Sequence, residues 1–212
     1  MKNFSLVVIL LIAVSCGPNN DHTKFETQED AKTDYQPNPK SIELNNKALE
    51  ITTFNFDDSI KVDSAIMLLD QATALDSLYF LGYVNKIMFL MMKNDFSRSL
   101  ETNQRIRELR PKQPKWIIQS ALIFELLGDL DKANTEYRKG IKAYENMLDS
   151  ETNLSWELEL EFAQSLVLAN DFDRAQDIIN KLKKENPDLE FWEAFELQTK
   201  NELLTLMNGK RP

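Results

Sequence analysis

Apolar residues along most of the chain recur every three or four positions, which is the spacing of one face of an α-helix. The last such stretch, Leu189 to Met207, is predicted to form one amphipathic helix. Helix breakers are scarce, with five glycines and seven prolines in 212 residues, and helix interiors tolerate neither. The pattern therefore predicts an all-α protein.

Four windows of the chain align when they are written one under another: residues 60–65, 94–99, 128–133 and 170–175. Each window ends in a small residue, as close helix packing requires, and these residues are Ala65, Ser99, Ala133 and Ala175. Successive members are 34, 34 and 42 positions apart. A fixed period of this length indicates an internal structural repeat.

Each window also has residues typical of a turn between two helices. The last three windows begin with residues that accept the left-handed conformation ending a helix, namely Asn94, Gly128 and Asn170. Every window holds a residue type that caps the start of the next helix, and these are Asp63, Ser97, Asp131 and Asp173. The sequence thus predicts four helical hairpins, each turning at one window.

The period and the turn residues resemble those of tetratricopeptide repeats. Ala121 to Gly140 resembles such a repeat closely, residues 156–189 resemble one fairly well, and residues 80–113 and 46–79 match less well. The resemblance implies a right-handed stack of about four TPR-like helix hairpins with a C-terminal capping helix. The longer last interval predicts that the second helix of the third hairpin runs long. The alternative is a generic helix bundle with accidental spacing.

The N-terminus has the pattern of an export signal. Lys2 is followed by an apolar run, Phe4 to Val14, that is too short to span a membrane. The run ends in Ala13-Val14-Ser15-Cys16-Gly17, which resembles the lipobox of bacterial lipoproteins. The resemblance implies a signal peptide over 1–15 and a lipid, such as palmitate, on Cys16. An ordinary cleaved signal with a chance cysteine is the alternative.

These predictions divide the chain into three parts. After the signal peptide, residues 16–40 form the lipidated cysteine and a polar, disordered tether. Residues 41–212 form the TPR-like helical repeat domain with its capping helix. We expect the domain to be exported and held at the bacterial cell membrane or outer membrane, facing the periplasm or the exterior.

Composition argues against several classes of function. The formal charge is −9, and an acidic surface repels phosphate backbones, so we expect no nucleic-acid partner. Cys16 is the only cysteine, and the only histidine, His22, lies in the tether. The five glycines are isolated and form no phosphate-binding loop. We therefore expect no enzyme activity, no metal, no cofactor and no small-molecule substrate.

The candidate binding site follows from the resemblance. In tetratricopeptide proteins, the first helices of successive hairpins line a concave groove that binds a protein or peptide partner. Carried onto this sequence, the groove is lined by Leu81, Val84, Met88, Met91, Met92, Ile118, Leu122, Glu125 and Leu126. Its methionines are adaptable contact residues. The alternative is that neighbouring helices cover these side chains and make them core.

Two functions remain open on this reading. The first is a membrane-anchored adaptor of the bacterial cell envelope that binds a protein or peptide in the groove. The second is a structural subunit of a larger envelope assembly, such as secretion or outer-membrane machinery, which binds through its outer helix faces.

Cys16→Ala tests the anchor. We expect the unaltered protein to require detergent for extraction, because acyl chains on one residue supply the attachment. The variant is expected to be soluble or poorly processed when cell fractions are blotted. Membrane fractionation unchanged by the substitution would show that Cys16 is not the anchor.

Overall fold

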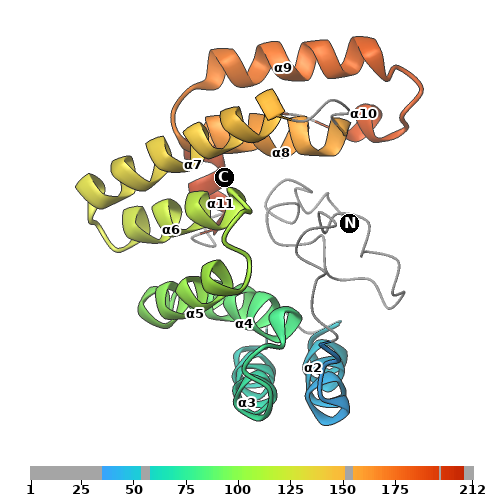
Figure 1. The fold of residues 1–212 in the computed structure, drawn as a ribbon, viewed down its shortest axis with the longest axis vertical. Coiled ribbons are helices and arrows are strands. Elements are labelled where there is room, and N and C mark those ends of the chain that lie inside the picture. The colour runs from blue at the N-terminus through green and yellow to red at the C-terminus, as the bar shows by residue number, and fades with distance from the viewer. Residues whose placement is uncertain (1–34, 54–57, 151–154, 196, 208–212) are drawn as a thin grey trace. The chain divides into compact units, whose positions relative to one another are not determined.

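A computed structural model describes residues 35–53, 58–150, 155–195 and 197–207 (Figure 1). The described residues form helices and no strand, so the predicted all-α class is confirmed. Cys16 and the predicted signal peptide lie outside them, as does most of the predicted tether. In this described part, none of the helices combines the length and the apolar character needed to cross a membrane.

The described chain divides into two compact units, residues 35–112 and residues 113–207. The N-terminal unit contains α2 (Pro39–Thr52), α3 (Ser59–Leu75), α4 (Phe80–Met92) and α5 (Phe96–Leu109). Each helix packs against the next one in the chain, and α2 also contacts α4. Adjacent pairing with a contact between the two first helices is the arrangement of stacked helical hairpins.

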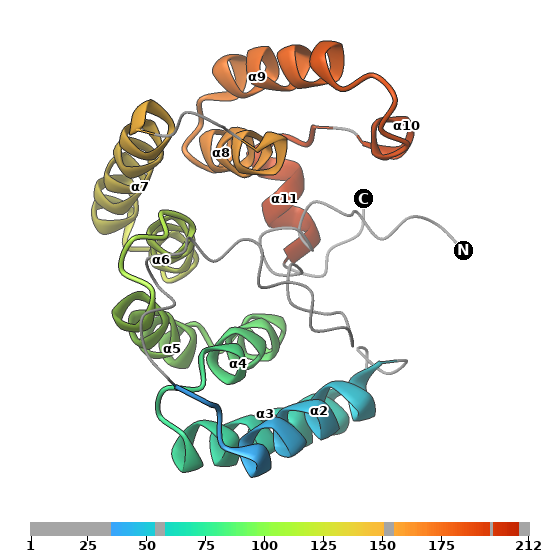
Figure 2. The same cartoon turned by 45° about the vertical axis from the view of Figure 1, so that its right-hand side comes forward.

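The C-terminal unit repeats this arrangement. Its helices are α6 (Lys115–Leu126), α7 (Leu130–Ser150), α8 (Trp156–Leu168), α9 (Phe172–Glu185), α10 (Phe191–Ala194) and α11 (Lys200–Met207). Helix α6 pairs with α7 and α8 pairs with α9, while α8 also contacts both α6 and α7 (Figure 2). Helix α7 has 21 residues, so the prediction of a long second helix in this hairpin is confirmed.

The predicted left-handed residues end α4, α6 and α8. Asn94, Gly128 and Asn170 have φ values of 56°, 83° and 66°. In each turn, the amide of the aspartate that follows donates to a carbonyl of the last helical turn, for example Asp95 N to Leu90 O at 2.9 Å. This is the Schellman motif, which satisfies carbonyl groups that a helix end leaves without partners.

The predicted caps Asp63, Ser97, Asp131 and Asp173 are wrong, because the helices begin earlier. The aspartate directly after the left-handed residue takes this position instead. Asp95 Oδ1 accepts from Arg98 N at 3.2 Å, and Asp129 Oδ1 accepts from Lys132 N at 3.2 Å. One aspartate therefore closes one helix with its amide and caps the next with its carboxylate, which leaves no room for a further turn residue.

The first window is not a turn, because residues 60–65 lie inside α3. The positions that align with Asn94 and Asp95 are occupied by Ile60 and Lys61, which suit neither a left-handed conformation nor a cap. The helix begins one turn earlier, where Asp58 Oδ1 accepts from Ile60 N at 3.0 Å and from Lys61 N at 3.3 Å.

Small residues lie at buried positions of the paired helices. Ala65, Ser99, Ala133 and Ala175 are fully buried or nearly so, as their spacing predicts. Gly140 shows how close the approach is in the α6–α7 pair. A Cβ atom placed there would lie 2.6 Å from Cδ1 of Ile118, which is too close for any side chain. Small side chains in register thus set the distance between paired helices.

The segment predicted as one helix over 189–207 is two helices. Phe195 ends α10 with extended backbone at ψ 121°, and α11 begins after Thr199. Thr199 N donates to Glu202 Oε2 at 2.7 Å, while Glu202 N donates to Thr199 Oγ1 at 3.4 Å. This reciprocal pair is a capping box, a Thr-x-x-Glu signature that favours a new helix start within an apolar pattern.

The folded part extends a few residues further toward the N-terminus than the sequence indicated. Tyr35 donates its hydroxyl to Asp76 Oδ2 at 2.7 Å, and Asn38 N donates to the same oxygen at 2.8 Å. Asn38 also caps α2 by accepting from Lys40 N at 2.9 Å. Prolines at 37 and 39 suggested a loop, but proline is favoured in the first turn of a helix, where α2 has it.

Substitution of the buried alanines tests the repeat alignment. Ala133→Leu and Ala175→Leu are each expected to destabilise the protein by about 1–3 kcal/mol, because the added methylenes have no space between paired helices. Asn134→Leu is the matched control, since Asn134 is exposed and the neighbouring Thr135 is half-buried. Thermal unfolding followed by circular dichroism measures the effect, and equal shifts for all three would contradict the alignment.

Candidate partner-binding site

The predicted groove residues of the N-terminal unit lie on two different sides of α4. Leu81 and Met92 are 44% and 41% exposed, and Met88, which shares their side of the helix, is half-buried. Val84 and Met91 are buried. Each of the two interpretations therefore describes part of this face. Leu81, Met88 and Met92 form an apolar stripe that is accessible at its two ends, while Met88 is partly buried against the core. Val84 and Met91 form a buried row beside the stripe.

A buried polar contact lies within the same stretch of α4. Asn85 Nδ2 donates to Asn45 Oδ1 at 2.7 Å, and both side chains are almost fully buried. This bond joins α2 to α4, the first helices of two successive hairpins. A buried amide without a hydrogen-bond partner destabilises the folded state, so the pair favours the one register of these helices in which the bond forms. Sequence reasoning missed it, since neither asparagine stands out by its spacing.

The corresponding residues of α6 are more enclosed. Ile118 and Leu122 are buried, and Ile118 lies against Gly140 of α7, so both residues are core of the C-terminal unit. Glu125 and Leu126 are half-buried. Of the four residues predicted to line the groove here, Glu125 is the one that places a charge on the face.

Glu125 is held by two residues from other helices. Tyr137 of α7 donates its hydroxyl to Glu125 Oε2 at 2.8 Å, and Lys200 Nζ of α11 lies 2.8 Å from the same oxygen. Lys200 Nζ also lies 4.6 Å from the centroid of the Tyr137 ring. Burial, followed by the Glu125 carboxylate, raises the pKa of Tyr137 well above its usual value. The hydroxyl therefore stays protonated and keeps donating.

The second half of helix α8 is covered on every side. Seven consecutive residues, Phe162 to Leu168, are buried, and seven residues make almost two full turns. Part of the covering comes from the end of the described chain, because Phe195 and Leu203 belong to the same hydrophobic core. Figures 1 and 2 both show α11 next to α8. The segment after α9 is therefore part of the hydrophobic core to which α8 belongs.

An aromatic cluster fixes the start of this segment. Phe191 and Trp192 lie with ring centroids 5.0 Å apart, and Trp192 lies 5.5 Å from Phe195. Trp156, at the start of α8, lies 6.0 Å from Phe191. Trp192 Nε1 donates to the carbonyl of Asn186 at 2.8 Å, so the polar N–H group of the indole has a hydrogen-bond partner. Apolar contacts thus attach α10 firmly to the α8–α9 pair.

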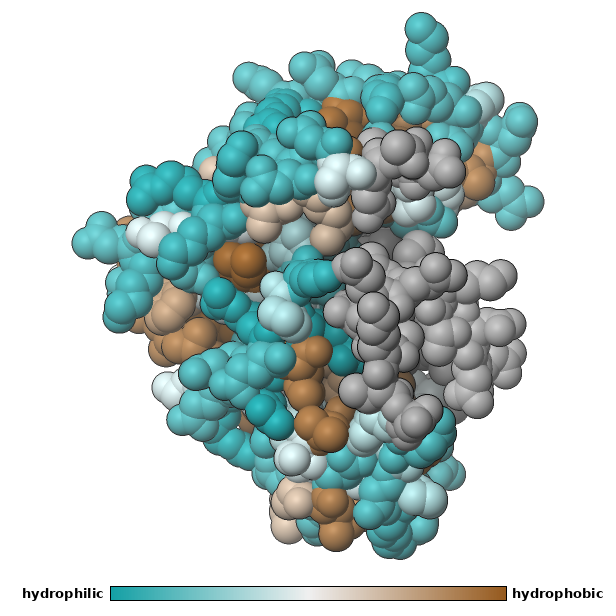
Figure 3. Space-filling model, in the orientation of Figure 1, coloured by the Kyte–Doolittle hydropathy of each residue, from teal (hydrophilic) through white to brown (hydrophobic). Residues whose placement is uncertain are grey.

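A second apolar surface lies on α3. Ile60 and Met67 are 77% and 63% exposed, and their spacing of seven residues places them on one side of the helix. On the face drawn in Figure 3, hydrophobic residues interrupt the hydrophilic surface in the region of α3 and α4. The N-terminal unit therefore presents accessible apolar side chains on two of its helices.

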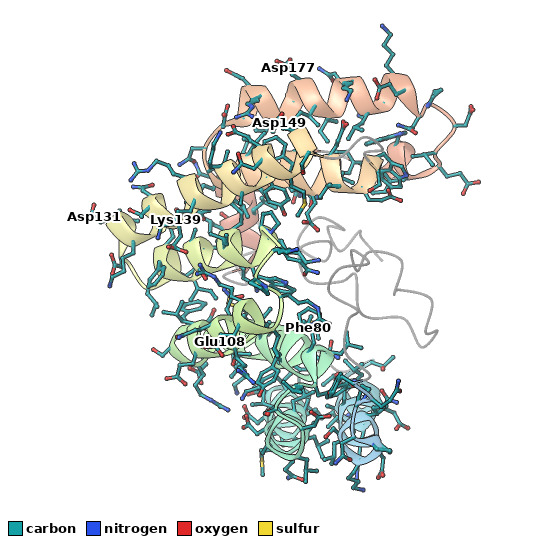
Figure 4. The ribbon with its side chains drawn as sticks, viewed as in Figure 1. Phe80, Glu108, Asp131, Lys139, Asp149 and Asp177 are labelled. Atoms are coloured by element: carbon teal, nitrogen blue, oxygen red, sulfur yellow. The ribbon has the colours of Figure 1, made fainter. Side chains whose placement is uncertain are left out.

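Several carboxylates of the C-terminal unit are separate from one another. Asp131 and Asp149 on α7 and Asp177 on α9 lie apart (Figure 4). Within the described ranges, His, Cys, Asp and Glu form no group of three that is placed to hold a metal ion. The features that the described residues do provide are helix faces with accessible apolar side chains and specific contacts between side chains of different helices.

Comparison of the chain with protein family models and with curated protein sequences finds no match.

Single substitutions separate the two sides of α4. Met91→Glu is expected to lower the free energy of unfolding by several kcal/mol, because it buries a carboxylate without a partner. Met92→Glu is expected to change the melting temperature little, because its side chain reaches water. Chemical denaturation of both variants measures the difference. Equal destabilisation would show that α4 has no accessible side.

Proposed function

We propose that this protein is a membrane-anchored adaptor of the bacterial cell envelope that binds a protein or peptide through its TPR-like hairpins. The main support for the proposal is that a helical segment of the same chain packs on the C-terminal unit, where its Lys200 pairs with Glu125 on α6. The repeat alignment relates Leu122 and Leu126 of α6 to Met88 and Met92 of the stripe on α4. A face that accepts a helix in one unit supports a similar role for its counterpart.

The stripe on α4 has the properties of a contact surface. Leu81 and Met92 are accessible without being needed for the core, and methionine side chains adapt to the shape of a partner. The bond between Asn45 and Asn85 lies beside them and joins α2 to α4. A rigid surface of this kind binds a partner without the entropic cost of ordering itself.

The anchor completes this proposal. Lipid on Cys16 would attach the protein to the cell membrane or outer membrane, with the helical hairpins facing the periplasm or the exterior. Attachment also raises the local concentration of the adaptor for partners in the same membrane.

A structural subunit of an envelope assembly is the second candidate. The observation that favours it is the apolar stripe of Ile60 and Met67 on α3, whose side chains are the most exposed large apolar groups of the described residues. Apolar surface of this kind is typical of contacts between subunits when it is part of a larger patch.

Crosslinking capture from solubilised envelopes distinguishes these two functions. The bait is the tagged full-length protein, compared with Leu81→Glu/Met92→Glu and with Ile60→Glu/Met67→Glu. Both pairs replace exposed side chains, so we expect all three baits to keep the same melting temperature.

If the protein is an adaptor, the α4 pair abolishes capture of the partner and the α3 pair leaves it unchanged, as read by mass spectrometry. Loss of capture with the α3 pair alone would instead support the structural subunit. Capture unaffected by either pair would contradict both proposals.

A further inference from the structure

The segment 197–207 covers a face of the C-terminal unit that differs from its counterpart on α4. The repeat alignment relates Glu125 to Met91 and Gln164 to Met88. Where the N-terminal unit has two methionines, the C-terminal unit has a carboxylate on α6 and an amide on α8. Polar groups at such positions select the ligand that satisfies them, so this face is more discriminating than one formed by methionines.

Lys200 is the residue of the covering segment that meets this carboxylate. Its side chain is only 11% exposed, although it carries a charge. Burial of a lysine is unfavourable unless the charge is paired, and here Glu125 supplies the opposite charge at 2.8 Å. The Tyr137 ring, 4.6 Å away, adds a cation–π contact. The site formed by Glu125 and Tyr137 is therefore built to receive a basic side chain.

The fit of the segment is nevertheless incomplete. Gln198 Oε1, which belongs to the segment, is buried without a hydrogen-bond partner among the described residues. A buried amide without a partner destabilises the arrangement that leaves it so. Helix α11 has only eight residues, and helices this short are marginal unless other contacts hold them. The segment is thus an occupant that a better-matched helix is able to replace.

We propose that the face formed by Glu125 and Tyr137 binds an amphipathic helix of a partner protein, and that segment 197–207 is its internal occupant. The partner helix carries a lysine or arginine three residues before a leucine, as Lys200 and Leu203 do. This inference rests on the proposed function as a protein-binding adaptor and names the chemistry of the partner.

The internal occupant has a consequence for affinity. A partner binds only to the fraction of molecules in which segment 197–207 has left the face, so its apparent affinity is reduced by that fraction. A change that releases the segment increases the affinity for a helix added from outside, without altering the site itself.

Lys200→Glu in the full-length protein creates this release, because it places a carboxylate beside Glu125. The probe is a synthetic peptide with the sequence of residues 197–207. We expect it to bind the variant about tenfold more tightly than it binds the unaltered protein, as measured by fluorescence anisotropy. Hydrogen exchange of the amides of residues 200–207 is expected to accelerate in the same variant.

Lys139→Glu is the matched control. Lys139 forms a similar 2.6 Å ion pair, with Glu136, but its side chain is 60% exposed on α7 (Figure 4). We expect this variant to bind the peptide as weakly as the unaltered protein does. If Lys200→Glu reduces the helix content seen by circular dichroism by more than the loss of α11 accounts for, Lys200→Gln replaces it in the same comparison.

Two further combinations test the site itself. First, a peptide that carries Lys200→Glu is expected not to bind the Lys200→Glu protein. Second, Glu125→Gln added to the Lys200→Glu protein is expected to abolish binding of the unaltered peptide. Equal binding to the Lys200 and Lys139 variants, or binding that ignores the charge of the peptide, would overturn the inference. That outcome is separate from failure of the adaptor proposal, which depends on capture through Leu81 and Met92.

Discussion

Three helical hairpins of this protein, α4–α5, α6–α7 and α8–α9, depend on a backbone conformation that most residues avoid. At Asn94, Gly128 and Asn170 the chain takes a positive φ, which reverses its direction directly after a helix. The aspartate that follows donates its amide to the preceding helix, and Asp95 and Asp129 also cap the following helix with the side chain. Because the turn is so short, the two helices must pack against each other, and this requires small residues at their contact.

Once the helices are paired, the outward sides of the first helices are available for other roles. In the N-terminal unit, Leu81 and Met92 keep part of α4 accessible. In the C-terminal unit, the segment after α9 covers α8, and Lys200 closes the polar part of the face by pairing with Glu125. The same hairpin architecture therefore supports an accessible surface in one unit and an occupied surface in the other.

Polar groups inside the units explain why these surfaces have defined chemistry. The bond between Asn45 and Asn85 sets the register of two first helices, because either amide would lose free energy without the other. Glu125 acts differently, since its partners come from α7 and from a segment that is separate in sequence. The Asn45–Asn85 bond therefore fixes how two helices pack. The Glu125–Lys200 pair, in the proposed exchange of segment 197–207, sets how readily another helix binds.

Local chemistry in the sequence determined much of this fold. Helical spacing and scarce breakers predicted the all-α class, and the left-handed residues at 94, 128 and 170 were identified from residue type alone. Both depend on interactions among neighbours in the chain, which the sequence displays directly. The helix starts were placed incorrectly because an N-cap also depends on the length of the turn. Asp95 and Asp129 each close one helix and cap the next, so the helix after each of them begins two residues earlier than predicted.

The tertiary structure decided which predicted groove residues are accessible. Helical spacing placed Val84, Met88 and Met92 together, but only packing against other helices buries the first and exposes the last. The partnership of Glu125 with Lys200 joins residues 75 positions apart, and no periodicity in the sequence indicates it. Burial and long-range pairing depend on where distant segments meet, and this is set by the sum of many weak contacts that a linear pattern does not contain.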